Sequence, residues 1–182
     1  DNEGIPNATI GRENYSLGGA PFSSTYQTFG ALYNFSAVQE WELCPSGWHI
    51  PSDSDWMQME SFLGMPENEL ISYDDSRGYA AGIHLALKDS LEVWQIPGNN
   101  SSGFSALPGG ISFSSNDGCF YLPEASNDQG WAMFGTNTVE NGGFIIRILT
   151  DSGSIGIPRF GVSSVSLGGD YDQYVSIRCV QD

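Results

Sequence analysis

The chain has 182 residues, a length that suits one domain with a sizeable hydrophobic core. Its 22 acidic and 6 basic residues give a formal net charge of −16, so we expect it to be repelled by nucleic acid and by anionic membranes. No run approaches the roughly 20 apolar residues that cross a membrane. The scattered carboxylates predict a solvated acidic surface, with Ca²⁺ binding as the alternative.

The composition favours short strands joined by long loops, because Gly, Ser and Asn abound and aromatic residues make up 13 % of the chain. The sequence opens on a polar stretch rather than on a signal peptide. If the protein is secreted, we expect the sequence to represent the mature form, from which the leader has been removed.

Residues 1–28 form the first segment and carry few large apolar side chains, which Gly and Asn interrupt. Such a segment cannot form a core alone. We predict that it is either a loose arm or a strand that completes the sheet of another copy. The apolar residues that would act in this assembly arm are Ile5, Ile10, Tyr15 and Leu17.

Residues 29–38 are densely hydrophobic and predict a strand or a short helix. Next, Pro45 and Gly47 indicate a turn, after which Trp48–Ile50 should be extended, since Pro51 disfavours helical geometry in the residue before it.

A helix is predicted over residues 53–63. Ser52 is a suitable N-cap residue, and Asp55, three residues on, nearly completes a capping box. Trp56, Met59 and Leu63 then follow at helical spacing, and Gly64 is expected to end the helix.

The second half of the chain predicts one more helix and then strands. The helix is expected around Ala80–Asp89, and a surface loop over residues 97–103. Because helices come early and strands late, the fold class is α+β. The predicted strands are Gly110–Ser114, Cys119–Leu122, Trp131–Gly135, Phe144–Thr150, Ser154–Ile157 and Tyr174–Val180, with Asp151-Ser152-Gly153 as a hairpin turn.

Three cysteines allow at most one intramolecular disulfide. We expect Cys44 and Cys179 to form it, since Cys44 opens the best-defined segment and Cys179 lies in the last predicted strand. Cys119 would then be left as a thiol in a strand. The alternative is a cytosolic protein with three buried thiols.

Four stretches carry a family resemblance: Phe29–Phe35 (FGALYNF), Cys44–Trp56 (CPSGWHIPSDSDW), Gly103–Gly110 (GFSALPGG) and Val175–Asp182 (VSIRCVQD). In this order they resemble the Fibrobacter succinogenes major paralogous domain, a bacterial surface and secreted family, over residues 29–182. The resemblance implies a C-type-lectin-like fold in which a cysteine near the first helix pairs with one in the final strand. The family's usual Trp-Met-Ala-Glu-Asn-Leu segment has no counterpart in residues 1–28.

The residues give little support for an enzyme. We expect His49 to be a structural side chain bonded to backbone and His84 to be exposed, and no spacing suggests a zinc site. If Cys44 and Cys179 are bonded to each other, no cysteine pair is left for catalysis.

The candidate binding residues are acidic and aromatic side chains in or beside the predicted loops. Asp53 and Asp55 are explained by the helix N-terminus, whereas the loop acids Asp170 and Asp172 are candidate Ca²⁺ ligands, with solvated carboxylates as the alternative. A carbohydrate platform would use exposed aromatic rings, some of which are expected to belong to the core instead. The candidates are Trp94, Tyr121, Trp131, Tyr171 and Tyr174.

Two functions follow as predictions for a secreted or cell-surface bacterial protein. The first is a structural subunit that assembles head-to-tail with copies of itself by donating residues 1–28 to a neighbouring sheet edge, with the negative charge limiting lateral association. The second is a lectin or adhesin whose loops bind glycans, with Ca²⁺ as a possible aid. Glycans could also be attached at the Asn-X-Ser/Thr sites that begin at Asn7, Asn14, Asn34, Asn99 and Asn100.

Overall fold

The structure is a computed structural model, and it describes residues 29–40, 42–91, 93–115, 118–122, 130–140, 143–150, 156–162 and 172–182. Helices are few and short, and the sheets are small and antiparallel, so the α+β class is confirmed. The helices are α2 (Phe35–Glu40), α3 (Asp53–Phe62), α4 (Glu67–Leu70) and α5 (Ile83–Leu87). The strands are β1 (Tyr33–Asn34), β2 (Trp48–His49), β3 (Ile111–Ser115), β4 (Gly118–Leu122), β5 (Trp131–Glu140), β6 (Gly143–Thr150), β7 (Arg159–Val162), β8 (Asp172–Val175) and β9 (Val180–Gln181).

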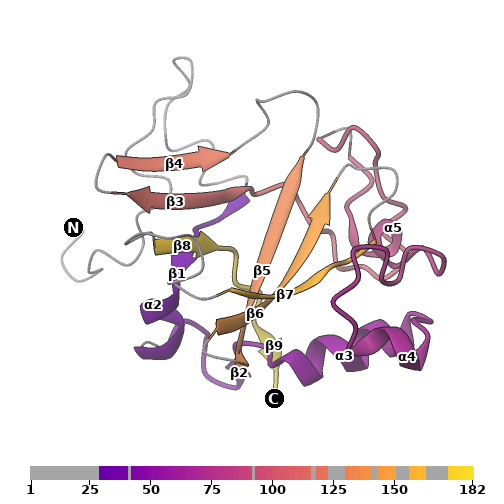
Figure 1. Cartoon of the computed structure of the whole chain (residues 1–182), viewed down its shortest axis with the longest axis horizontal. Coiled ribbons are helices and arrows are strands. Elements are labelled where there is room, and N and C mark those ends of the chain that lie inside the picture. The colour runs from indigo at the N-terminus through magenta and orange to yellow at the C-terminus, as the bar shows by residue number, and fades with distance from the viewer. Residues whose placement is uncertain are drawn as a thin grey trace.

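In the described part of the chain, the strands form three sheets with the orders β1-β8-β3-β4, β5-β6-β7 and β2-β9 (Figure 1). The first two sheets are joined where the chain leaves β8. There the amide of Gly135 donates to the carbonyl of Ser176 at 3.0 Å, and the amide of Ser176 donates to the carbonyl of Met133 at 2.9 Å. A Cβ atom on Gly135 would lie 2.8 Å from a methyl group of Val175, so this close approach requires glycine.

The main core lies on the face of the β5–β6 hairpin that α3 and α5 cover. Trp56 of α3 packs there against Phe104 and Phe134, with ring centroids 5.4 and 5.7 Å away. The opposite face of the hairpin is also buried, through Met133, Ile146, Ile148 and Val175. Because both faces are covered, all eight residues of β6 are buried. Trp56, Met65, Ile83, Leu87, Trp94, Ala106, Ala132, Phe134, Leu149 and Ile157 form the main core.

The expected helix over residues 53–63 is α3, and its ends are as predicted. Ser52 caps it, with its hydroxyl accepting from the amide of Asp55 while the Asp55 carboxylate accepts from the amide of Ser52, so the capping box is complete. Gly64 follows the helix with a φ of 98°, in the left-handed region that favours glycine.

Other predicted elements need correction. Residues 29–38 contain both a strand, β1, and the start of a helix, α2. The second helix, α5, has only five residues. Ile157 is not in a strand, because its amide bonds the carbonyl of Arg77, and pairing with β6 begins only at Arg159. The rest of the expected strand Ser154–Ile157 and the hairpin turn at Asp151-Ser152-Gly153 lie largely outside the described residues.

Candidate functional site

A hollow of about 450 Å³ opens between α2, the turn before β2, and β5. Val38 of α2 and Ile50, which follows β2, are the buried part of its apolar lining and are each 8 % exposed. Glu42, Ser46 and Asn137 supply polar groups at its wall. These polar residues are exposed, so the hollow is open to solvent and combines buried apolar residues with exposed polar ones.

Trp48 belongs to the wall of this hollow and is 45 % exposed. The turn ahead of it is as predicted: the amide of Trp48 donates to the carbonyl of Pro45 at 3.0 Å, and Gly47 has a φ of 79°. Strand pairing with Gln181 of β9 then fixes the backbone of Trp48. A large aromatic side chain is thus held at the surface by a rigid backbone.

The disulfide between Cys44 and Cys179 lies beside the hollow, with Cα atoms 5.8 Å apart. The predicted pairing is confirmed. Because β2 follows Cys44 after a short turn and β9 follows Cys179 directly, the bond and the two-stranded sheet fix the same pair of segments.

His49 also lines the hollow, and its expected bond to backbone is wrong. Its Nδ1 atom lies 2.7 Å from Oδ1 of Asp182, and its Nε2 atom lies 3.4 Å from Oδ2 of Asp55. The hydrogen bond to Asp182, with a smaller contribution from Asp55, raises the pKa of His49 above its ordinary 6.5. The histidine joins the end of β9 to the first turn of α3.

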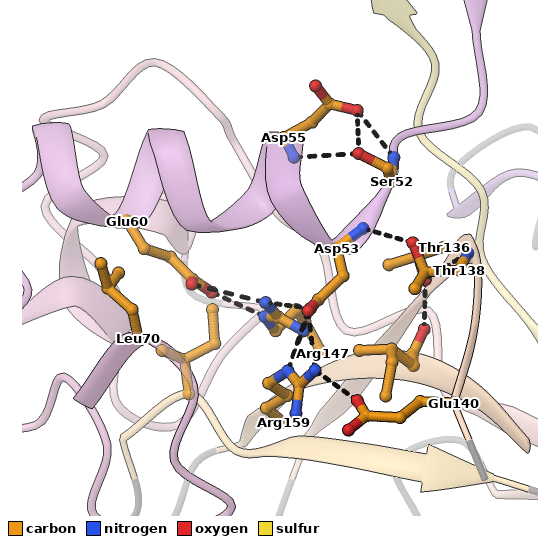
Figure 2. A network of polar contacts seen from close by, with 12 residues as sticks. Ser52, Asp53, Asp55, Glu60, Leu70, Thr136, Thr138, Glu140, Arg147 and Arg159 are labelled. Atoms are coloured by element: carbon orange, nitrogen blue, oxygen red, sulfur yellow. Dashed lines mark hydrogen bonds and ion pairs between the residues drawn. The ribbon is translucent and has the colours of Figure 1, made fainter. Parts of the chain in front are cut away.

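Beneath α3, a chain of ion pairs connects the helix to the three-stranded sheet (Figure 2). Asp53 accepts from Arg147 of β6 at 2.7 Å and from Arg159 of β7 at 2.8 Å. Arg159 also donates to Glu140 of β5 at 2.6 Å. One carboxylate of the helix thus bridges arginines on two neighbouring strands.

The same chain of ion pairs continues through Glu60, which is 0 % exposed. Arg147 donates to Glu60 through Nε at 2.7 Å, and Arg77 binds the same carboxylate through both terminal nitrogens. Arg77 also donates to the carbonyls of Glu69 and Leu70, both at 2.7 Å. We call Asp53, Glu60, Arg77, Glu140, Arg147 and Arg159 the ion-pair network.

Asp53 was expected only to favour the N-terminus of α3, but it also belongs to the ion-pair network. Burial alone would raise its pKa, but hydrogen bonds from Arg159 and the charge of Arg147 outweigh burial and lower the pKa below its ordinary 3.8. Asp53 is 6 % exposed, so its position at the helix N-terminus is only part of its role. Sequence reasoning missed this network, although an arginine within the apolar run Phe144–Thr150 was a signal for it.

Of the five aromatic residues predicted to form a platform, two are buried in the structure, Trp94 and Tyr174. Trp94 is 1 % exposed and its indole nitrogen donates to the carbonyl of Ala106 at 2.8 Å, so it belongs to the core. Tyr174 is 3 % exposed and packs with Leu32, while Trp131 is partly buried against the second face of the hairpin. The side chain of Tyr121, on β4, and all of Tyr171 lie outside the described residues.

The expected exposure of His84 is also wrong. Its ring stacks on Tyr79, with centroids 5.1 Å apart, and the residue is 7 % exposed. Burial, helped by the positive charge of Lys88, lowers its pKa below 6.5. His84 is therefore a buried residue whose protonated form the fold disfavours.

The Ca²⁺ prediction concerns residues of which the structure says little. Asp170 lies outside the described residues, and only the backbone of Asp172, on β8, is described. Within the described part of the chain, no group of three or more His, Cys, Asp or Glu side chains could hold a metal ion. The arm residues Ile5, Ile10, Tyr15 and Leu17 also lie outside it. No described helix is long and apolar enough to cross a membrane.

One family of known proteins matches most of the chain. The model of the Fibrobacter succinogenes major domain matches residues 12–181. The chain therefore belongs to the Fibrobacter succinogenes major domain family. The match takes in residues 12–28 of the predicted arm as well as the domain that follows. No curated protein and no solved structure matches the chain.

Proposed function

We propose that this protein is a non-enzymatic, extracellular subunit with a C-type-lectin-like fold, and that it assembles with copies of itself through residues 1–28. The fold proposal is supported by two features together. The main helix, α3, comes early in the domain, and a disulfide links the segment ahead of it to the segment that leads into the last strand.

The observation that carries the assembly proposal is the edge of the three-stranded sheet. Among the described residues β7 is an outer strand, and its neighbour β6 is buried along its whole length. Outer strands present backbone groups on which an extended segment can add as a further strand. A strand added beside β7 would extend a sheet whose central strand is fully buried.

The donor that we propose is the arm of a second copy. Its apolar residues Ile5 and Ile10 are spaced among polar ones, so a strand made from it would need an external partner to cover them. Donation from each copy to the next is a head-to-tail contact, which gives a filament when it does not close into a ring.

The non-enzymatic part of the proposal rests on the side chains that a catalyst would need. Cys44 and Cys179 are bonded to each other, and the ring nitrogens of His49 both face carboxylates. His84 is buried against Tyr79. Each of these groups has a structural partner or position that accounts for it.

Sedimentation velocity and negative-stain microscopy of the full chain test the assembly. We expect oligomers or filaments from the wild type and monomers from Ile5→Asp/Ile10→Asp. The matched control is Asn7→Asp/Asn14→Asp, which adds the same charge at polar positions and should assemble like the wild type. Monomers from the wild-type chain at all accessible concentrations would overturn the proposal.

A further inference from the structure

We propose that the hollow beside the disulfide is a binding site for a neutral saccharide, with one pyranose ring stacked on Trp48. This site is separate from the predicted aromatic residues of the later loops. The proposal is argued from described residues between Val38 and Asn137 and does not use the proposed assembly through residues 1–28.

The size and lining of the hollow fit a small ligand. Ligand sites in proteins usually measure about 300–1,000 Å³ and combine apolar walls with a few polar groups. The hollow, at about 450 Å³, lies within that range. It has apolar walls from Val38 and Ile50 and polar groups from Glu42, Ser46 and Asn137.

Trp48 provides the stacking surface. A pyranose ring has an apolar face of C–H groups, which can pack on an indole ring while the hydroxyl groups point sideways. Trp48 leaves nearly half of its surface exposed, at 45 %, and its backbone is fixed by pairing with β9. A backbone that is already in place loses little conformational entropy when a ligand binds.

The polar groups around Trp48 suit hydroxyl groups. The side-chain amide of Asn137 is oriented by donating to the carbonyl of Ile50 at 3.1 Å, which leaves its oxygen as an acceptor. Glu42 offers a second acceptor, and the hydroxyl of Ser46 both donates and accepts. Sugar hydroxyls also donate and accept, so they can pair with all three side chains.

The charges favour a neutral ligand. A net charge of −16 repels anionic sugars. A cation would gain little, because Glu42 is the only carboxylate among the described lining residues and is exposed, and exposed ion pairs contribute only about 0–1 kcal/mol. The nearby carboxylates of Asp55 and Asp182 already face the ring nitrogens of His49.

The test is a titration of the ¹⁵N-labelled full chain with methyl glucoside, methyl galactoside and N-acetylglucosamine, followed at the indole N–H signals. We expect at least one sugar to shift the Trp48 signal with a Kd of about 1–10 mM. In the Trp48 variants, which lack this indole signal, binding is followed at the backbone amide signals of Ser46 and Asn137. Trp48→Ala should weaken binding at least tenfold, Trp48→Phe less, and Phe62→Ala, which removes a ring that is 89 % exposed outside the hollow, not at all.

Two further variants test the proposal even if Trp48→Ala fails to fold. Ser46→Leu adds bulk at the rim and should also abolish the shift, whereas Glu42→Gln, which keeps an acceptor oxygen, should change the Kd less than fivefold. No shift of Trp48 by any of the three sugars at about 100 mM would overturn the proposal. A shift caused by choline instead, and lost in Glu42→Gln, would overturn it in favour of a cation site.

Discussion

Glu60 holds two arginines, Arg77 and Arg147, in a place that water does not reach. Of the five Lys and Arg residues in the part of the chain that the structure describes, four are buried: Arg77, Lys88, Arg147 and Arg159. The interior thus takes up most of the positive charge. The remaining surface is correspondingly acidic, which favours solubility and opposes non-specific association with anions.

The first prediction concerns Glu60→Gln. Removing one partner of a buried ion pair leaves the other charge without compensation, so we expect the free energy of unfolding to fall by about 3–5 kcal/mol. Urea unfolding followed by tryptophan fluorescence measures this change. Glu67→Gln, on the surface of α4, is the matched control and should change stability by less than about 0.5 kcal/mol. Equal effects of the two variants would contradict a stabilising role for the network.

The second prediction uses the two histidines, whose pKa values move in opposite directions. The folded state raises the pKa of His49, so this residue stabilises the fold fully below pH 6.5 and loses that contribution as the pH rises through its folded pKa. The folded state lowers the pKa of His84, which therefore stabilises the fold above pH 6.5 and loses that contribution as the pH falls.

NMR titration of the two imidazole rings tests these directions. We expect His49 to titrate above pH 6.5 and His84 below it. Asp182→Asn should bring the pKa of His49 down toward its ordinary value, because the Asp182 hydrogen bond is the main cause of the shift. The same variant should leave His84 unchanged. A His49 pKa below 6.5 in the wild-type chain would show that the contact with Asp182 does not form in solution.

At the scale of elements, α3 could be predicted closely because its signals are local. Ser52, Asp55 and Gly64 act through backbone groups within three residues or through their own dihedral angles, so the sequence alone specifies both ends of the helix. The β6 strand could be predicted for a similar reason, since four apolar residues precede or follow Arg147 closely in its run, Ile145, Ile146, Ile148 and Leu149.

The hollow and the ion-pair network could not be predicted in this way, because they depend on contacts between distant segments. Asp53 and Arg159 are 106 residues apart, and Asn137 meets Ile50 across 87 residues. The prediction that Trp94 is an exposed binding residue is wrong for the same reason. Its position beside a loop does not indicate that its indole nitrogen donates to the carbonyl of Ala106 inside the core. No local pattern carries this information.

The third prediction concerns the N-cap of α3. Ser52→Ala removes the hydroxyl that accepts from the amide of Asp55, and losing such a cap costs about 0.5–2 kcal/mol. Ser54→Ala is the matched control, because Ser54 is exposed within the first turn and should change stability by less than about 0.5 kcal/mol. Thermal unfolding of both variants gives the comparison. If the two melt at the same temperature, the capping box does not stabilise the folded state.

At the scale of the whole molecule, the disulfide closes a loop in which 135 positions separate the two cysteines. It brings together segments near the two ends of the described chain, β2 and β9, which pair over only two residues each. So short a sheet gives few hydrogen bonds of its own. We infer that the covalent bond and the contact between His49 and Asp182 hold this end of the domain closed, and with it the wall of the hollow.

The fourth prediction follows from that geometry. In the chain-entropy model, a disulfide that closes so long a loop stabilises the folded state by up to about 5 kcal/mol, so Cys44→Ser/Cys179→Ser should lose a large part of that stability. Urea unfolding of the variant and of the wild type, each with and without a reductant, measures the loss. The reductant should destabilise the wild type and leave the variant unchanged. Intact mass after alkylation without reduction should show one modified thiol in the wild type, and three would show that the bond does not form. Because β2 carries Trp48, the variant should also bind sugars more weakly than the wild type at concentrations of denaturant where both remain folded.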